Sequence, residues 1–228
     1  MNFPVLNAKT SAKAKSAILR VVRPLLPNIW DRAYRTYRHS HYSSAGLIFC
    51  HIPKNAGSSI AFSLYRRRLG HMRLSQLISE NKEGLPILAI WRDPVARFLS
   101  SCKYASGGGG TDGIIANAES YQKIRSVSEF LDHLEKLPDS ERDPVFRTQS
   151  WYLDVLANDL HATNLTLCRV SELPKLQSLK WFRNLDFSAK RNASDPHSIP
   201  KTDDDLRRIR KLYENDFRAL ERYSEFFL

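Results

Sequence analysis

The chain has 228 residues, of which 42% are hydrophobic and 26% are charged. These proportions are ordinary for a globular protein and exclude wholesale disorder, a collagen-like chain and a coiled coil. The formal net charge of +11 suits nucleic acid, anionic lipid or an anionic substrate. No apolar run approaches the roughly 20 residues that are needed to span a bilayer.

Residues 1–44 form the most basic part of the chain. They hold eight lysines and arginines against a single acid, Asp31. Apolar residues recur with helical spacing between Ile18 and Ile29, and two prolines in this stretch interrupt any long helix. We expect a basic N-terminal extension, which either packs on the following domain as a short helix or contacts a membrane or an anionic polymer.

The main domain begins at residue 45. Residues 47–50 are a short apolar run, typical of a buried strand, and an amphipathic helix with Ile60 and Leu64 on one face follows soon after. The loop between them reads H-I-P-K-N-A-G-S-S over residues 51–59.

This loop has the composition of an anion-binding loop. Free backbone N–H groups at the start of a helix bind phosphate or sulfate. Gly57 lets the backbone approach an anion closely, Lys54 adds a cation, and two serines add hydroxyl donors. Taken alone, the loop could also be an ordinary strand-to-helix turn.

The loop is not the phosphate loop of nucleoside triphosphatases. That motif is G-x-x-x-x-G-K-[ST], with the lysine directly after the last glycine. Here Lys54 precedes Gly57 by three residues. We also find no apolar strand that ends in an obvious magnesium-binding aspartate, so a triphosphate with magnesium is disfavoured.

A second strand over residues 87–91 ends at Arg92-Asp93-Pro94, and a helix over residues 95–104 follows with the proline in its first turn. The guanidinium of Arg92 is a forked, permanently charged clamp for phosphate. Ser100 lies about two helical turns further on. Taken alone, the segment could equally be a salt-bridged helix cap.

The remaining elements continue the alternation of strands and helices. In chain order we predict a flexible glycine loop at 107–110, a helix with a capping box at Ser126 and Glu129, and a helix over 144–157. A strand over 165–170 comes next, followed by a helical segment over 171–185 that is broken by Pro174. The last predicted element is a helix over 203–217 with a solvated acidic start. This alternation predicts an α/β fold with a parallel sheet.

Together, the segments H-I-P-K-N-A-G-S-S and W-R-D-P-V-A-R-F-L-S resemble the two cofactor signatures of sulfotransferases. The likeness is greatest to the carbohydrate branch that includes uronyl O-sulfotransferases and bacterial relatives. It implies a single P-loop-like α/β domain over residues 45–228, with a parallel sheet flanked by helices. It also implies 3′-phosphoadenosine 5′-phosphosulfate as the sulfuryl donor. We expect no metal.

The resemblance also implies site residues. Those expected at the 5′-phosphosulfate are Lys54, Asn55, Ala56, Gly57, Ser58 and Ser59. Arg92 and Ser100 are expected at the 3′-phosphate. Asn55 stands where a threonine is common, which is a mild departure.

Fainter likeness extends over residues 47–220. The segment Q-S-W-Y-L at 149–153 resembles a mid-chain segment of the family. The segment R-N-A-S at 191–194 resembles a loop that closes over the nucleotide, which implies Arg191 and Ser194 as nucleotide contacts.

Sulfuryl transfer requires a cation at the leaving oxygen and a base for the acceptor hydroxyl. Lys54 is the natural cation. A base should titrate near neutrality, which favours histidine. His71 matches the position of the family's base, His51 is the second candidate, and an unassigned acid or no base at all stays open.

The function expected from these signals is sulfation of a hydroxyl on a sugar or polysaccharide. The alternatives are a kinase-like enzyme that uses a nucleoside triphosphate, and a basic nucleic-acid-binding protein. The second alternative lacks a helix-turn-helix, RNA-recognition or zinc signature, so we expect no nucleic acid partner. The three cysteines lie among apolar neighbours, which predicts buried thiols and a cytoplasmic protein, with peripheral membrane contact through residues 1–44 left open.

Overall fold

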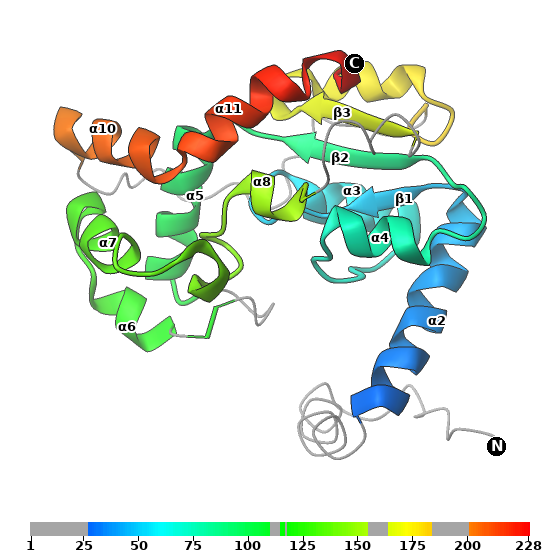
Figure 1. The fold of residues 1–228 in the computed structure, drawn as a ribbon, viewed down its shortest axis with the longest axis horizontal. Helices are drawn as coiled ribbons and strands as arrows, with labels where there is room; N and C mark the ends of the chain where they lie inside the picture. Colours follow the sequence, from blue (N-terminus) through cyan, green and yellow to red (C-terminus); the bar gives the residue numbers. More distant parts are fainter. Residues whose placement is uncertain (1–26, 110–114, 117, 155–163, 184–200) are drawn as a thin grey trace. The chain divides into compact units, whose positions relative to one another are not determined.

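The computed structural model describes residues 27–109, 115–116, 118–154, 164–183 and 201–228 (Figure 1). By its contacts the chain divides into two compact units, Met1–His41 and Tyr42–Leu228. Helix α2 (Pro27–Ala45) begins in the first unit. A proline is favoured at the first position of a helix, because its missing N–H group would have no partner there. The predicted apolar pattern from Ile18 to Leu25 lies outside the described residues.

The second unit contains a three-stranded parallel sheet that is flanked by helices (Figure 1). The strands are β1 (Ile48–Cys50), β2 (Ile87–Trp91) and β3 (Leu165–Arg169), in the order β1-β2-β3. Every residue of β1 and β2 is buried, as expected for strands covered on both faces. The predicted strands and the α/β class with a parallel sheet are confirmed.

The described part of the second unit also contains helices, several of which the sequence predicts. They are α3 (Gly57–Tyr65), α4 (Leu74–Glu80), α5 (Pro94–Ser106), α6 (Ala118–Lys123), α7 (Val127–Leu134), α8 (Gln149–Tyr152), α10 (Asp203–Leu212) and α11 (Glu214–Arg222), with 3-10 turns η2 (Asp139–Glu141), η4 (Val170–Ser178) and η5 (Ser224–Phe226). The helices predicted after β1, after β2 and after Ser126 are confirmed. At the last of these, the Ser126 side chain accepts from the backbone of Glu129, whose carboxylate accepts from Arg125.

Three predicted helical segments are wrong in type or extent. The segment predicted over 171–185 is the 3-10 turn η4, which contains Pro174 and ends at Ser178. The helix predicted over 144–157 is only α8 in the described part, because residues 144–147 form turns and Thr148 begins the helix as its cap. The helix predicted over 203–217 divides at Tyr213, whose backbone leaves the helical region and whose buried hydroxyl donates to Phe146 O. The start of α10 is also less solvated than predicted, because buried Asp205 forms a capping box with Thr202.

Two hydrophobic clusters form the core of the second unit. One surrounds the sheet, and the other joins α5, α6, α7 and α10 around Phe98, Phe130 and Phe146. The three cysteines are free and buried, as predicted. None of the helices in the described ranges combines the length and hydropathy of a bilayer span.

Candidate anion-binding site

Two loops meet at the carboxyl ends of neighbouring parallel strands. Residues 51–56 follow β1, and Arg92 follows β2. Open α/β sheets bind ligands at this edge. The guanidinium Nη1 of Arg92 donates to the carbonyl oxygen of Lys54 at 3.0 Å. The structure therefore brings together the two segments that the sequence singled out.

The backbone of the first loop is strained. Lys54 and Ala56 both have positive φ, at 69° and 59°, and each such non-glycine residue costs about 1 kcal/mol or more. Left-handed residues that alternate with ordinary ones turn successive N–H groups to one side, which makes a concave anion site. Ala56 is also the N-cap of α3, and no side chain caps that helix. The loop and the helix start thus present backbone donors together.

The side chain of Lys54 crosses to α5. Its ammonium Nζ lies 4.1 Å from the ring centroid of Tyr104. A cation above an aromatic face gains about 0.5–2 kcal/mol, depending on its exposure. This contact restricts the position of the charge beside the strained loop.

Asn55 lies differently from the rest of the loop. Its side chain is buried, and Nδ2 donates to Ile90 O and to Gln149 Oε1, both at 2.6 Å. The amide thus ties the loop to β2 and to α8. The prediction that Asn55 contacts the phosphosulfate therefore depends on its backbone N–H group.

Gly57 is required for a reason that the sequence did not suggest. Its φ is not positive, but a Cβ atom at this position would overlap Cδ2 and Nε2 of the His51 imidazole. The imidazole is backed by Phe49, whose ring centroid lies 5.4 Å away. Gly57 therefore makes room for a buried side chain.

His51 is neutral in the folded protein. Burial lowers its pKa well below the ordinary value of 6.5, and nearby His71 and Arg68 lower it further. Below about pH 6.5 His51 is protonated in the unfolded chain but stays neutral in the folded chain. The free energy of unfolding therefore decreases as pH falls below that value.

We expect unfolding experiments to detect this effect of His51 as a pH dependence of stability. Below pH 6.5 the free energy of unfolding should decrease by up to about 1.4 kcal/mol per pH unit because of His51. Denaturant titrations of His51→Gln should show a shallower pH dependence, while His133→Gln, which changes an exposed histidine on α7, should match the wild type. Equal slopes for the wild type and His51→Gln would contradict the assignment.

His71 lies in the loop between α3 and α4, half-buried, against His51. Its Nδ1 is 2.8 Å from the carbonyl oxygen of His51, and the two ring centroids are 4.2 Å apart. A carbonyl oxygen only accepts, so this contact places the proton of a neutral His71 ring on Nδ1. Nε2 is then the proton acceptor.

The second loop differs from the first at its helix. The carboxylate of Asp93 caps α5 by accepting from Ala96 N at 2.8 Å, so this helix start already has an acceptor. Arg92 is half-buried, and burial lowers the pKa of its guanidinium, which nevertheless stays charged. Ser100 is half-buried on α5. Arg191 and Ser194 lie outside the described residues.

Two site residues were missed by the sequence reasoning, although the segment that contains them was singled out. Gln149 is fully buried and contacts both loops. Trp151 packs against two guanidinium groups, and the Cζ atoms of Arg73 and Arg147 lie over its ring, 4.9 Å and 4.4 Å from the ring centroid. Arg73 also pairs with Asp154 at 2.8 Å.

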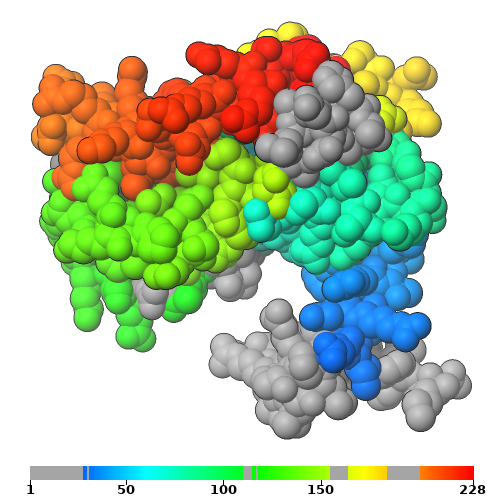
Figure 2. Space-filling model, viewed as in Figure 1, coloured from blue at the N-terminus to red at the C-terminus, as the bar shows by residue number. Residues whose placement is uncertain are grey.

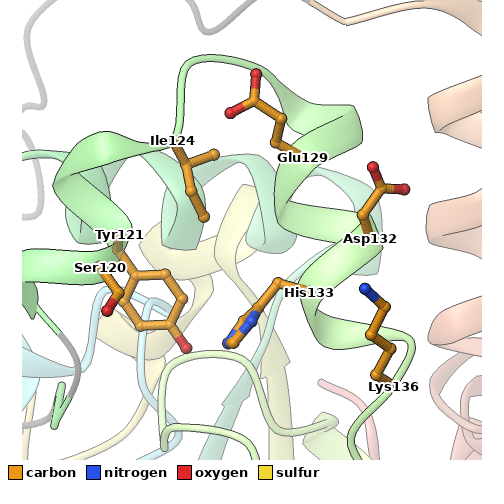
Figure 3. A pocket seen from close by; sticks show the side chains of 7 residues that line it. All are labelled: Ser120, Tyr121, Ile124, Glu129, Asp132, His133 and Lys136. Carbon is orange, nitrogen blue, oxygen red and sulfur yellow. The ribbon is translucent and has the colours of Figure 1, made fainter.

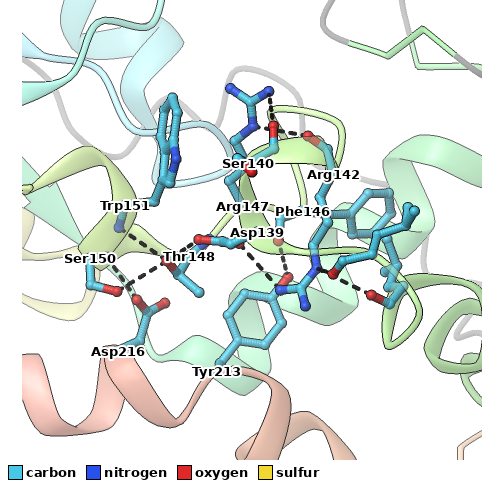
Figure 4. A network of polar contacts seen from close by, with 12 residues as sticks. Asp139, Ser140, Arg142, Phe146, Arg147, Thr148, Ser150, Trp151, Tyr213 and Asp216 are labelled. Atoms are coloured by element: carbon cyan, nitrogen blue, oxygen red, sulfur yellow. Dashed lines mark hydrogen bonds and ion pairs between the residues drawn. The ribbon is translucent and has the colours of Figure 1, made fainter.

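Helix α8 is held firmly from both sides (Figure 4). The hydroxyl of Thr148 accepts from Trp151 N and donates to Asp139. Ser150 N donates to Asp216 Oδ1 at 2.8 Å, and Asp216 belongs to α11. In the space-filling view the red C-terminal residues lie directly beside the yellow-green segment that contains α8 (Figure 2), in agreement with the contacts between α11 and α8.

A shallow hollow of about 320 Å³ lies elsewhere, between α6 and α7 (Figure 3). Its lining residues are Ser120, Tyr121, Ile124, Glu129, Asp132, His133 and Lys136. The hollow shares no residue with either loop. Its acids already have partners, since Glu129 accepts from Arg125 N and Asp132 pairs with Arg208.

Comparison with known proteins gives no relative. No family model, no curated protein and no solved structure matches the chain. Within the described ranges, no cluster of three or more histidine, cysteine or acidic side chains is placed to hold a metal ion. The functional interpretation therefore depends on the chemistry of the two loops.

Proposed function

We propose that the chain is a sulfotransferase, which moves a sulfuryl group from 3′-phosphoadenosine 5′-phosphosulfate to a hydroxyl of a carbohydrate, on a P-loop-like α/β fold. One observation supports this most strongly. A lysine loop with uncapped helix amides and an arginine loop meet at adjacent strand ends, joined by Arg92 Nη1 and Lys54 O at 3.0 Å. Two separate anion-binding elements suit a nucleotide with phosphates on both its 3′ and 5′ carbons.

The donor side of the reaction uses the first loop. The backbone donors at 54–59 bind the 5′-phosphosulfate, with Ser58 and Ser59 in the first turn of α3. As the S–O bond to the 5′-phosphate breaks, negative charge grows on the leaving oxygen. Lys54 stabilises that charge, which is the kind of electrostatic contribution that lowers a barrier most.

The acceptor side uses the loop after α3. The sugar hydroxyl attacks sulfur in line with the leaving oxygen, so that one S–O bond forms as the other breaks. Its proton passes to Nε2 of His71, the ring nitrogen that does not contact His51 O. Trp151, two residues beyond Gln149, packs against the guanidinium groups of Arg73 and Arg147, and through this packing it positions two cations that suit the oxygens of a sugar.

Arg92 should determine preference for the 3′-phosphate. The wild type should bind adenosine 3′,5′-bisphosphate more tightly than AMP, because a charge-assisted bond contributes about 1.5–3 kcal/mol, or roughly 10- to 150-fold. Calorimetry should show that Arg92→Ala loses this preference. The control Arg207→Ala removes a largely exposed arginine on α10 and should keep it. Equal affinity of the wild type for both nucleotides would end the proposal.

Trp151 should affect the acceptor and not the donor. In steady-state assays, Trp151→Ala should raise the acceptor KM by about tenfold, equivalent to about 1.4 kcal/mol, and leave the donor KM unchanged. Trp181→Ala is the matched control, because Trp181 lines a hollow at the amino ends of the strands. A raised donor KM, or an unchanged acceptor KM, would remove Trp151 from the acceptor site.

Two measurements test the proposed reaction itself. Thermal denaturation should show stabilisation by adenosine 3′,5′-bisphosphate and none by ATP with magnesium; the reverse would favour a kinase-like enzyme. A screen of sugars and polysaccharides with radiolabelled sulfuryl donor should then identify an acceptor. Absence of transfer to any carbohydrate hydroxyl would contradict a carbohydrate sulfotransferase.

A further inference from the structure

We infer that Gln149 is a positioning residue that fixes the spacing of the two anion-binding loops, an inference that rests on the proposed function. Gln149 is the first residue of α8 and is 0% exposed. It reaches both loops from a third segment of the chain. Its role follows from which atoms its carboxamide contacts.

The carboxamide completes the backbone pairing of Arg92. Arg92 directly follows β2, so its N–H and C=O groups need partners beyond the end of the strand. Gln149 Oε1 accepts from Arg92 N at 3.0 Å, and Gln149 Nε2 donates to Arg92 O at 2.8 Å. A carboxamide offers a donor and an acceptor at the spacing of a peptide group, whereas a carboxylate only accepts.

The same carboxamide joins the first loop. Gln149 Oε1 also accepts from Asn55 Nδ2 at 2.6 Å, and that Nδ2 donates in addition to Ile90 O. Asn55 lies between the two left-handed residues of the loop, Lys54 and Ala56. One buried side chain therefore connects the strained loop after β1 to the arginine loop after β2.

Gln149 is itself fixed by other parts of the fold. Its backbone N–H donates to Asp216 Oδ2 at 3.0 Å, and Ser150 N donates to Oδ1 of the same buried carboxylate. Thr148 caps α8 from the other side. Gln149 is thus held in place by contacts with Asp216 and by the Thr148 cap, which do not involve the two loops.

This arrangement has a specific consequence for ligands. A nucleotide with two phosphates contacts both loops at once, and its second contact is favourable only when the loops already have the correct spacing. A nucleotide with one phosphate contacts one loop and does not depend on the spacing. Gln149 should therefore control the advantage of a bisphosphate over either monophosphate.

The experiment compares three nucleotides on the full chain by calorimetry. In Gln149→Met, which keeps the length and removes the polar atoms, the Kd of adenosine 3′,5′-bisphosphate should rise at least about tenfold. The Kd values of AMP and adenosine 3′-monophosphate should each change less than about threefold. Tyr152→Phe is the control, because it removes one hydrogen bond of α8, from the buried Tyr152 side chain to Pro144 O, which belongs to neither loop. It should leave all three affinities unchanged.

The outcomes separate this inference from the proposed function. If the wild type does not prefer the bisphosphate, the proposed function fails and the inference fails with it. If the wild type prefers it and Gln149→Met keeps that preference, only the inference is overturned. Equal weakening of all three nucleotides would show a merely structural role and also overturn it. Should Gln149→Met fail to fold, Gln149→Asn, one methylene shorter, undergoes the same comparison with the same criteria.

Discussion

Replacement of Lys54 by alanine is expected to reduce turnover by about 100- to 1,000-fold, because removal of one preorganised electrostatic donor from a developing charge has an effect of that order. Affinity for adenosine 3′,5′-bisphosphate should change much less, since the backbone donors of the loop and the uncapped start of α3 remain. Single-turnover kinetics with saturating donor separate the chemical step from binding.

Two further variants make this result specific. Lys54→Met keeps most of the aliphatic stem and the packing against Tyr104 but removes the charge, so it should be as slow as Lys54→Ala. Lys82→Ala removes an exposed lysine after α4 and should react at the wild-type rate. Near-normal turnover in Lys54→Met would show that the charge is not used at the leaving oxygen.

Replacement of His71 by alanine is expected to remove most of the activity, since a positioned general base contributes about 100- to 10,000-fold. The base must be neutral to accept a proton, so wild-type activity should fall as pH falls and the imidazole becomes protonated. Rate–pH profiles of His71→Ala should lack this acidic limb in the residual activity. Nucleotide affinity should hardly change, because the base contacts the acceptor.

The neighbouring histidine provides the comparison. His51 is neutral because of burial and faces Gly57 and Phe49, so His51→Gln should lower stability more than it alters the shape of the rate–pH profile. A His71→Ala variant that keeps both its rate and its acidic limb would exclude His71 as the base. His51 would then be the next residue to test.

The strands and the two loops were predictable because their signals are local. Residues 47–50 and 87–91 are uniformly apolar, and each run stops at a polar segment that contains proline. The two segments were paired by their joint resemblance to sulfotransferases, and the structure brings Arg92 to Lys54 because the carboxyl ends of neighbouring parallel strands lie at one edge. Helix α4 was not predicted, since seven residues give too few turns for a clear periodic pattern.

The residues that organise the site were not predictable in this way. Gln149 is separated by 57 residues from Arg92 and by 94 from Asn55, and no local pattern records such contacts. A polar Asn55 in a loop suggests exposure, yet its amide is buried against β2. The left-handed backbone of Lys54 and Ala56 could not be predicted either, because neither lysine nor alanine favours that conformation.

The contact between Gly57 and His51 means that these two positions are constrained as a pair. Alanine at 57 is excluded by the imidazole and not by the backbone, so a relative with a small residue at 51 could carry alanine at 57 with the same loop geometry. Substitutions at 51 and 57 should therefore be non-additive, each tolerated or not according to the other. A search pattern that demands the glycine by itself would pass over such relatives, whereas one that scores the two positions jointly would retain them.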